Sequence, residues 1–344
     1  MAPEFDLIAR HFTRATPGAV LGVGDDCALL APSPGMQLAV SSDMLLEGRH
    51  FSPQDGPAGV GHKSLAVNLS DLAAMGATPR WATLSIALPE ANDAWLGAFA
   101  RGFFRMADQH GIELVGGDTT RGALAISLTV MGEVPPGQAL RRDGAQIGDD
   151  IWVSGTLGAA AMALAYRQGR LEMDQVDAAK VLPALYLPTP RVELGIALRG
   201  IAHSAIDISD GLLGDLGHIL ERSRVGAASM GATSMDATSI GAPSIEATSM
   251  GATLEFAALP TLPVVQTYLH EAIARDCILA GGDDYELCFT AAADRRDSVQ
   301  QAAESAGVRV TRIGRITADG DLKVIDAAGA PLHYDSTGYD HFAA

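Results

Sequence analysis

Acidic residues set among glycines and small apolar residues are the side chains of this sequence that could do chemistry. They recur at the ends of apolar segments, in GVGDDCALL, SSDMLLEGRHF, AVNLSDLAAMGA, VGGDTTRG, AIDISDGLLGDLG and AGGDDYELCF. Burying a carboxylate is costly unless it is paired or holds a cation. Basic partners are outnumbered, since 24 lysines and arginines face 41 acids and the only lysines are Lys63, Lys180 and Lys323. The recurrence of isolated acids therefore indicates bound metal.

Magnesium is the metal that these residue types favour. Hard cations take oxygen ligands from carboxylates, hydroxyls and water, whereas zinc or iron would require His or Cys. A single aspartate of this kind is more often a helix cap or a turn residue, and it is the repetition that favours metal. The candidate oxygen ligands are Asp25, Asp26, Ser41, Ser42, Asp43, Asp71, Asp118, Asp207, Ser209 and Asp210.

The GGDTTRG segment is a candidate phosphate-binding turn. It follows an apolar segment, its glycines allow backbone N–H groups to approach a phosphate, and Thr119 and Thr120 offer hydroxyls. Glycine turns after strands are common, so this segment is a weak indication by itself. The sequence contains no GxxxxGK[ST] motif. If the chain binds phosphates, metal must contribute much of the binding.

The composition disfavours several classes of partner. A formal net charge of -17 and a pI near 4.8 would repel nucleic acid and anionic membranes. Divalent cations in a carboxylate-lined cleft would offset that charge and attract phosphates. Cys27, Cys277 and Cys288 show no CxxC spacing, which predicts a reducing, cytoplasmic location. Without an apolar leader or a spanning segment, we expect no membrane association.

The length of 344 residues predicts two α/β domains. We place the boundary in VPPGQALRRDGAQIGD, which gives domains 1–148 and 149–344. In the first domain, LGVGDDCALLAP and QLAVSSDMLLE have the pattern of strands, and helices are expected from Gly61 to near Gly76 and over residues 93–110.

Residues 226–253 form a five-residue repeat, GAASM GATSM DATSI GAPSI EATSM GAT. A β-solenoid or a Met-rich contact surface is one interpretation. The repeat is too short to stack a solenoid core, so we favour a low-complexity surface loop inserted in the second domain.

Taken in order, these motifs resemble those of the thiamine-monophosphate kinase family across nearly the whole chain. The strings are GVGDDCALL, SSDMLLEGRHF, KSLAVNLSDLAAMGATP, VGGDTTRG, SAIDISDGLLGDLGHI, GGDDYELCF and GYDHF. Looser forms of AVNLSDLAAMGA and GGDTTRG occur in the wider superfamily of aminoimidazole ribonucleotide synthetase and selenophosphate synthetase. The GRHF and GYDHF strings favour the thiamine enzyme. The sequence also lacks the N-terminal reactive Cys of the selenium enzymes and the C-terminal Cys of the hydrogenase-maturation proteins.

The resemblance implies a two-domain α/β (α+β) fold. The N-terminal mixed sheet would pair with its twin in a homodimer, the C-terminal domain would be α+β, and the active site would lie in the cleft between them. The implied activity is a magnesium-dependent, in-line transfer of the ATP γ-phosphoryl group to thiamine monophosphate. This is the last step of thiamine diphosphate biosynthesis.

The resemblance also implies residue roles. The magnesium ligands would be Asp26, Ser41, Ser42, Asp43, Asp71, Asp118, Asp207 and Asp210, of which Asp71 and Asp207 are the most critical. Gly117, Asp118, Arg142 and Ser209 match positions that contact ATP, and His50, Asp283 and Tyr339 match positions near thiamine monophosphate. The family often has Thr at position 42 and Glu at position 283, so the Asp283 contact is one methylene shorter here.

Two alternatives stay open at this stage. Another ATP-dependent member of the superfamily would activate a carbonyl oxygen as a phosphate ester. A non-catalytic nucleotide-binding or metal-binding protein would bind ATP with magnesium and show no turnover.

Overall fold

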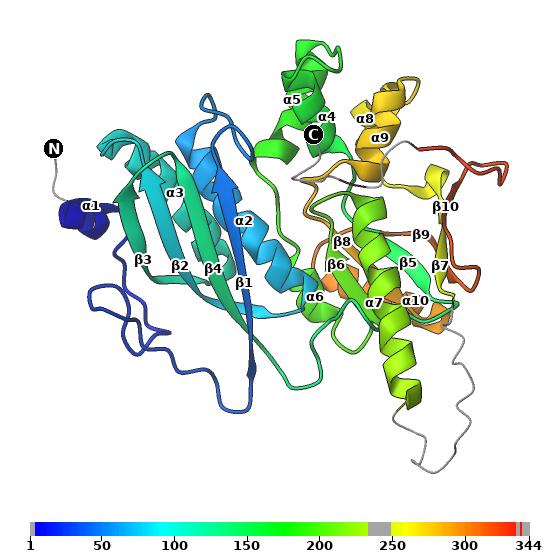
Figure 1. Ribbon diagram of the computed structural model, residues 1–344, viewed down its shortest axis with the longest axis horizontal. Helices are drawn as coiled ribbons and strands as arrows, with labels where there is room; N and C mark the ends of the chain where they lie inside the picture. Colours follow the sequence, from blue (N-terminus) through cyan, green and yellow to red (C-terminus); the bar gives the residue numbers. More distant parts are fainter. Residues whose placement is uncertain (1–3, 233–248, 335–337, 339–344) are drawn as a thin grey trace. The chain divides into compact units, whose positions relative to one another are not determined.

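The structure, a computed structural model, describes residues 4–232, 249–334 and 338. The chain forms two compact units (Figure 1). The first unit contains Met1–Ala139 and Tyr186–Val192, and the second contains Leu140–Leu185 and Glu193–Ala344. The boundary expected from the sequence, between residues 148 and 149, lies a little further along the chain than this division.

The first unit is a four-stranded mixed sheet with helices. Strands β2 and β3 are parallel, and the other pairs are antiparallel, in the order β1-β4-β2-β3. The helices are α1 (Glu4–His11), α2 (Pro57–Ala74) and α3 (Asp93–His110), and the strands are β1 (Gln37–Leu46), β2 (Thr78–Leu88), β3 (Glu113–Arg121) and β4 (Ala125–Val134).

Local sequence signals set the ends of α2 and α3. Helix α2 starts with a proline in its first turn, and the chain leaves it at Gly76, whose φ is 61°. Helix α3 has an Asn92 cap that accepts the Trp95 N–H, and it ends at Gly111 with φ 62°. Both helices were predicted, and α3 has the predicted bounds.

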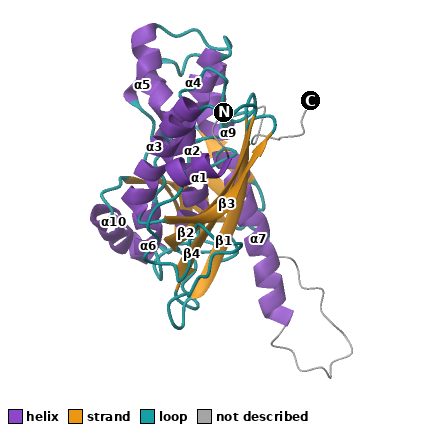
Figure 2. Cartoon of the chain, turned by 90° about the vertical axis from the view of Figure 1, so that its left-hand side faces the viewer, coloured by secondary structure: helices purple, strands orange, loops and turns teal. Residues whose placement is uncertain are grey.

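Helices α2 and α3 pack closely against each other on one side of the sheet (Figure 2). Two glycines allow this approach. A Cβ added at Gly61 would overlap the carbonyl oxygen of Phe99, and one at Gly102 would overlap the carbonyl oxygen of Ala58. The contact is therefore backbone to backbone, and it sets the distance between α2 and α3.

We expect Gly102→Ala to destabilise the protein by about 1–3 kcal/mol, because the added methyl group forces the two helices apart. The matched control is Gly97→Ala in the same helix, where the nearest atom to an added Cβ is a His11 ring carbon at 3.4 Å. There the helix propensity of alanine should stabilise by roughly 0.5–1 kcal/mol. Urea unfolding of both variants measures the difference, and equal effects would refute the close contact.

The second unit is built on a six-stranded sheet in the order β10-β7-β9-β5-β8-β6. Only β7 and β10 are parallel, among the strand pairs of this sheet that the structure describes. The strands are β5 (Asp150–Ser154), β6 (Ser204–Asp207), β7 (Gly251–Glu255), β8 (Leu287–Ala291), β9 (Val310–Thr317) and β10 (Leu322–Ile325). The helices are α4 (Ala159–Arg167), α5 (Gln175–Tyr186), α6 (Val192–Ala197), α7 (Leu212–Ala232), α8 (Pro263–Thr267), α9 (Ala272–Ala280) and α10 (Arg296–Ser305), with short 3-10 turns at Phe256–Ala258 and Ala293–Arg295.

A buried ion pair ties α10 to the centre of this sheet. Asp150 in β5 is fully buried and accepts two hydrogen bonds from Arg296, the shorter at 2.6 Å. Arg312 of β9 lies 3.5 Å away. These guanidinium groups hold the pKa of Asp150 below its usual range despite the desolvation that opposes them.

Two expectations about local structure were wrong. The LGVGDDCALLAP segment forms isolated bridges, Leu21 with Leu29 and Val23 with Asp25, because Gly24 at φ 130° interrupts the extended chain. The repeat at 226–253 is not a loop throughout. Residues 226–232 continue α7, as their alanines favour, and residues 251–253 begin β7. Residues 233–248 of the repeat lie outside the described residues.

Helices long and apolar enough to cross a bilayer do not occur in the parts of the chain that the structure describes.

Candidate active site

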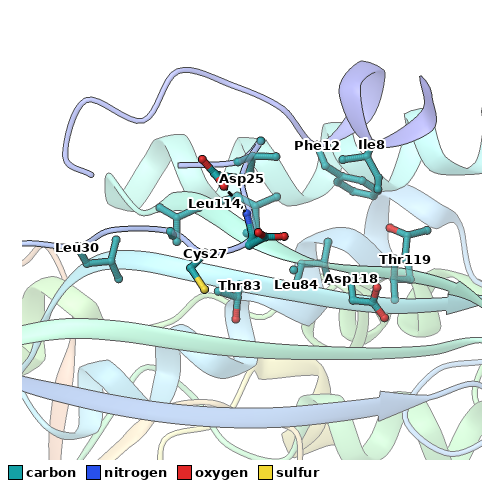
Figure 3. Close-up of a pocket in the computed structure, with 18 of the residues that line it drawn as sticks. Ile8, Phe12, Asp25, Cys27, Leu30, Thr83, Leu84, Leu114, Asp118 and Thr119 are labelled. Atoms are coloured by element: carbon teal, nitrogen blue, oxygen red, sulfur yellow. Dashed lines mark hydrogen bonds between the residues drawn. The ribbon is translucent and has the colours of Figure 1, made fainter. Parts of the chain in front are cut away.

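A pocket of about 400 Å³ lies in the first unit, where the loop at residues 23–30 passes over β2 and β3 (Figure 3). Its polar side combines Asp25 and Asp26 from the loop with Asp118 and Thr119 from β3. Its apolar side chains include Ile8, Phe12, Leu30, Leu84 and Leu114. The pocket thus joins an apolar wall to exposed carboxylates, which fits a ligand with a ring at one end and a cation-bound anion at the other.

Glycine at position 117 is required by the sheet. Gly117 has φ 150°, and a Cβ there would overlap the carbonyl oxygen of Leu84 in β2. The close approach of β3 to β2 places Asp118 beside Ser85, at the exposed end of the strand pair. The glycine expected to contact ATP is therefore also the residue that lets β3 present Asp118.

The β1 strand places Ser41 and Asp43 on the side of α2. The Ser41 hydroxyl donates to an Asp71 carboxylate oxygen at 2.5 Å. The Asp43 N–H donates to the side-chain oxygen of Asn68 at 3.1 Å, and the Asn68 amide donates to Ser64. Asn68 is fully buried, so it fixes the register of α2 against β1. The structure brings together the predicted ligands Ser41 and Asp71.

Ser42 points to the opposite face of the sheet. Its hydroxyl donates to the Leu128 carbonyl of β4 at 2.8 Å and lies 2.9 Å from the Thr129 hydroxyl. Successive side chains of a strand alternate between faces. Ser42 is therefore not brought together with Ser41 and Asp43.

His50 is held in one orientation by the main chain. Its Nδ1 accepts the Leu46 N–H at 3.0 Å. In the neutral ring the proton must then lie on Nε2, which makes Nε2 a hydrogen-bond donor. The buried Lys63 ammonium donates to the His50 carbonyl at 3.4 Å. This geometry fits a histidine that positions an anion.

In the second unit, β6 ends at Asp207, which is 3% exposed. The loop at residues 208–211 follows and carries Ser209 and Asp210, both half-buried. The N–H groups of Ser209, Asp210 and Gly211 all donate to one carboxylate oxygen of Asp215, each at 3.1 Å. The predicted ligand Asp207 thus directly precedes, and the predicted ligand Asp210 lies within, a loop that Asp215 holds.

Asp215 was missed by the sequence analysis. Burial raises the pKa of Asp215 to about 7, against the lowering effect of the N–H groups that it accepts. An acid in the first turn of a helix directly after the DISDG string was the signal available.

Asp283 and Tyr285 both adopt left-handed backbone conformations, with φ of 70° and 51°. Non-glycine residues seldom do so, and such strain concentrates at functional sites. The Asp283 N–H donates to the Ser209 carbonyl at 2.9 Å, and the Tyr285 hydroxyl donates to Asp283 at 3.0 Å. The predicted substrate contact Asp283 is thereby joined to the loop of Ser209 and Asp210.

Asp284 and Glu286, the other acids of this segment, accept hydrogen bonds from neighbouring parts of the second unit. The Asp284 carboxylate accepts the Gly158 N–H at the start of α4, at 2.9 Å to the nearer oxygen. Desolvation raises the pKa of Asp284 well above its usual range, although that N–H favours the ionised form. The Ser154 hydroxyl donates to Glu286 at 2.5 Å. We infer structural roles for both acids.

Arg142 and Tyr339 are the two remaining predicted residues. Arg142 is exposed, and its carbonyl accepts the Ser223 hydroxyl at 3.1 Å. Tyr339 lies outside the described residues. Its neighbour Gly338 lies against the loop of the second unit, since a Cβ added there would be 3.2 Å from the Asp210 carbonyl oxygen.

The donor chemistry fits magnesium. Within the described ranges, no three His, Cys, Asp or Glu side chains are close enough to hold a metal ion together. Magnesium is commonly bound by one or two carboxylates, with water and substrate phosphates completing its shell. Pairs such as Ser41 with Asp71 supply oxygen ligands of that kind.

The three cysteines should differ in reactivity. Cys27 is exposed in the pocket, whereas Cys277 and Cys288 are buried. Burial raises the pKa of Cys277 to about 12 and that of Cys288 further. We expect one thiol to react with a disulfide reagent at pH 8 in the native protein and three after denaturation. Cys27→Ser should abolish the native reaction, and two or more reactive thiols in the native protein would contradict the burial.

The fold is that of the AIR synthase related proteins. The family model of the N-terminal domain matches residues 24–134, and that of the C-terminal domain matches residues 146–327. Hydrogenase maturation protein HypE from E. coli shares this fold at 21% identity, with a TM-score of 0.72 over 96% of this chain and 95% of that one.

Closer relatives narrow the family. The chain is 42% identical to thiamine-monophosphate kinase of Escherichia coli K12, over 99% of this chain and 98% of the relative. The enzyme of that name from Haemophilus influenzae is 39% identical, with 98% of each covered. A crystal structure of thiamine-monophosphate kinase from Stenotrophomonas maltophilia K279a is 48% identical, with a TM-score of 0.78 over 93% of this chain and 94% of that one. The chain belongs to the thiamine-monophosphate kinase family.

Proposed function

We propose that the chain transfers the γ-phosphoryl group of ATP to the phosphate of thiamine monophosphate, giving thiamine diphosphate and ADP. The observation that carries this proposal is the similarity to thiamine-monophosphate kinases over the full length of the chain. A structure described as AaThiL complexed with AMPPCP and TMP supports it, at 26% identity and a TM-score of 0.72 over 98% of this chain and 96% of that one. AMPPCP is an analogue of ATP.

The reaction would complete thiamine diphosphate synthesis in the cytoplasm. The three cysteines are free, which fits a reducing compartment.

The transfer requires positioning more than proton removal. An acceptor phosphate oxygen forms a bond to the γ-phosphorus as the bond to the β,γ-bridging oxygen breaks, and that electron pair leaves with ADP. The acceptor is already ionised at neutral pH, so no strong base is needed. Bound magnesium would supply neutralisation of the phosphate charges.

Side chains of each unit would take part in this work. In the first unit, Asp26 and Asp118 line the pocket, and Asp71 with Ser41 offers a second set of oxygens. Asp43 lies on the same side of β1 as Ser41, with its main chain fixed by Asn68.

The second unit would contribute Asp207 and Asp210 to metal and Ser209 and Arg142 to ATP. His50, with its proton on Nε2, and Asp283 would orient thiamine monophosphate, and we keep Tyr339 in the same role. Ser42, which faces the other side of β1, remains the least supported of the proposed ligands.

The deciding experiment incubates the purified protein with ATP, magnesium and thiamine monophosphate, with free thiamine in a parallel reaction. Equimolar thiamine diphosphate and ADP from the monophosphate alone are expected. ATP binding without product would support a non-catalytic protein. Turnover with a carbonyl acceptor instead would support the other activity of the superfamily.

We expect Asp71→Asn to lower kcat at least about 1,000-fold, since it removes a charged metal ligand next to the transferred group. The control is Asp108→Asn, an exposed acid of the first unit paired with Arg14. Titration with magnesium checks the cause. The Asp71 variant should need more magnesium for half-maximal rate, and an unchanged requirement would contradict its role as a ligand.

We also propose that the chain forms a homodimer through the sheet of the first unit. The edge strand β1 exposes Leu38, Val40, Met44 and Leu46. They occupy alternate positions of the strand, so they share the face of the sheet that is opposite α2. A contiguous exposed apolar face of this kind on a sheet edge indicates a partner.

Val40→Asp should convert a dimer to a monomer, because it places a charge in the apolar face of β1. Val176→Asp is the matched control, as Val176 is 68% exposed and Val40 is 60% exposed. Light scattering after size-exclusion chromatography gives the masses. A wild-type monomer, or a Val40 variant that stays dimeric, would count against this interface.

A further inference from the structure

Asp215 makes contacts that a helix cap alone does not require. One of its carboxylate oxygens accepts three consecutive main-chain N–H groups, from Ser209, Asp210 and Gly211, each at 3.1 Å. The side chain is 3% exposed. A buried carboxyl oxygen that accepts three N–H groups is a strong local constraint, since its removal would leave three main-chain donors without their partner.

The loop that Asp215 holds is joined to a second segment by main-chain hydrogen bonds. The Asp283 N–H donates to the Ser209 carbonyl at 2.9 Å, and the Tyr285 N–H donates to the Ile208 carbonyl at 2.8 Å. These two bonds set the left-handed residues of the second segment directly against the loop.

Backbone contact between the two segments leaves little freedom for either to shift alone. A Cβ added at Gly282 would overlap the Ser209 carbonyl oxygen. Gly211, at φ 118°, is equally tight, because a Cβ there would lie 2.6 Å from the Ala280 main chain. A displacement of residues 208–211 must therefore displace residues 282–285.

We propose that Asp215 is a positioning residue of the phosphoryl-transfer site, whose buried carboxylate holds residues 208–211 and, through them, residues 283–285. The metal and nucleotide contacts proposed at Ser209 and Asp210 and the acceptor contact proposed at Asp283 then form one hydrogen-bonded assembly. This inference rests on the proposed function for the roles of those residues, and on the hydrogen bonds for their coupling.

Three variants test the assembly. Asp215→Ala removes the acceptor, and Asp215→Asn keeps one acceptor oxygen while removing the charge. Asp149→Asn is the control, because Asp149 is also 3% exposed in the second unit and bonds to the Gln146 N–H and His203. Asp215→Ala and Asp149→Asn should both lower the melting temperature by several degrees.

Amide hydrogen exchange of the full-length protein without substrates gives the direct measurement. In Asp215→Ala, exchange at residues 208–211 and at residues 283–285 should both accelerate at least about tenfold, since local opening now costs fewer hydrogen bonds. Exchange in β8 should not change. Asp215→Asn should stay near the wild type, and Asp149→Asn should leave both segments protected.

Steady-state kinetics supply the second measurement. A displacement of about 1 Å in reacting groups can cost about 100-fold. We expect Asp215→Ala to lower kcat by about that factor and to raise KM for both ATP and thiamine monophosphate. Asp215→Asn should remain within about tenfold of the wild type, because it can still accept the N–H groups.

Three outcomes would overturn the proposal. In the first, residues 283–285 stay protected from exchange in Asp215→Ala. In the second, Asp215→Asn exchanges as fast as Asp215→Ala. In the third, Asp149→Asn has the melting temperature of Asp215→Ala and loses as much kcat as that variant does. A wild-type protein without kinase activity would refute the proposed function instead, and the exchange data would still decide whether Asp215 joins the two segments.

Discussion

Holding 41 acidic side chains in a chain with 24 lysines and arginines is the constraint on which the rest of the structure depends. Asp150 is matched by Arg296 and Arg312 at the centre of the second sheet. Asp215 and Asp284 are matched by main-chain N–H groups at the starts of helices, where the helix dipole also favours negative charge. Within the described residues, Asp26 and Asp118 receive neither solution, and they lie exposed in a pocket, where a cation with its phosphate ligand can bind them.

The sequence predicted the elements that carry this pattern better than the directions of single side chains. The period of the apolar residues predicted α2 and α3, because a helix face repeats regularly along the chain. Ser41, Ser42 and Asp43 were taken together as ligands, yet strand alternation sends Ser42 to the other face. The direction of the Ser42 side chain could therefore have been derived from the sequence alone.

Other features could not be derived in this way. The left-handed conformations of Asp283 and Tyr285 are set by bonds to Ser209 and Ile208, more than seventy residues earlier, and no local signal specifies them. Asp215 was missed for the same reason, since a first-turn acid has the same sequence signature whether it caps one N–H or three. The repeat was misjudged at its start because Ala-rich units are compatible with helix wherever a preceding helix can extend into them. It was misjudged at its end because residues 251–253 pair with β9, which lies more than fifty residues later in the chain.

Joining the proposed acceptor contact to the proposed nucleotide contact suits the chemistry of transfer between two phosphates. Both reactants are anions that repel each other, so their alignment must be imposed by the protein and by bound cations. A carboxylate such as Asp283 cannot attract the acceptor phosphate directly, and it can act only by orienting the other end of the substrate or by sharing a cation. In either case the contribution of Asp283 to substrate binding would depend on a fixed distance to Asp210. The Asp283 side chain is shorter than that of Glu, so it tolerates less error in that distance. Two strained residues, held by main-chain bonds to the Ser209 loop, provide that fixed distance at the cost of about 1–3 kcal/mol each.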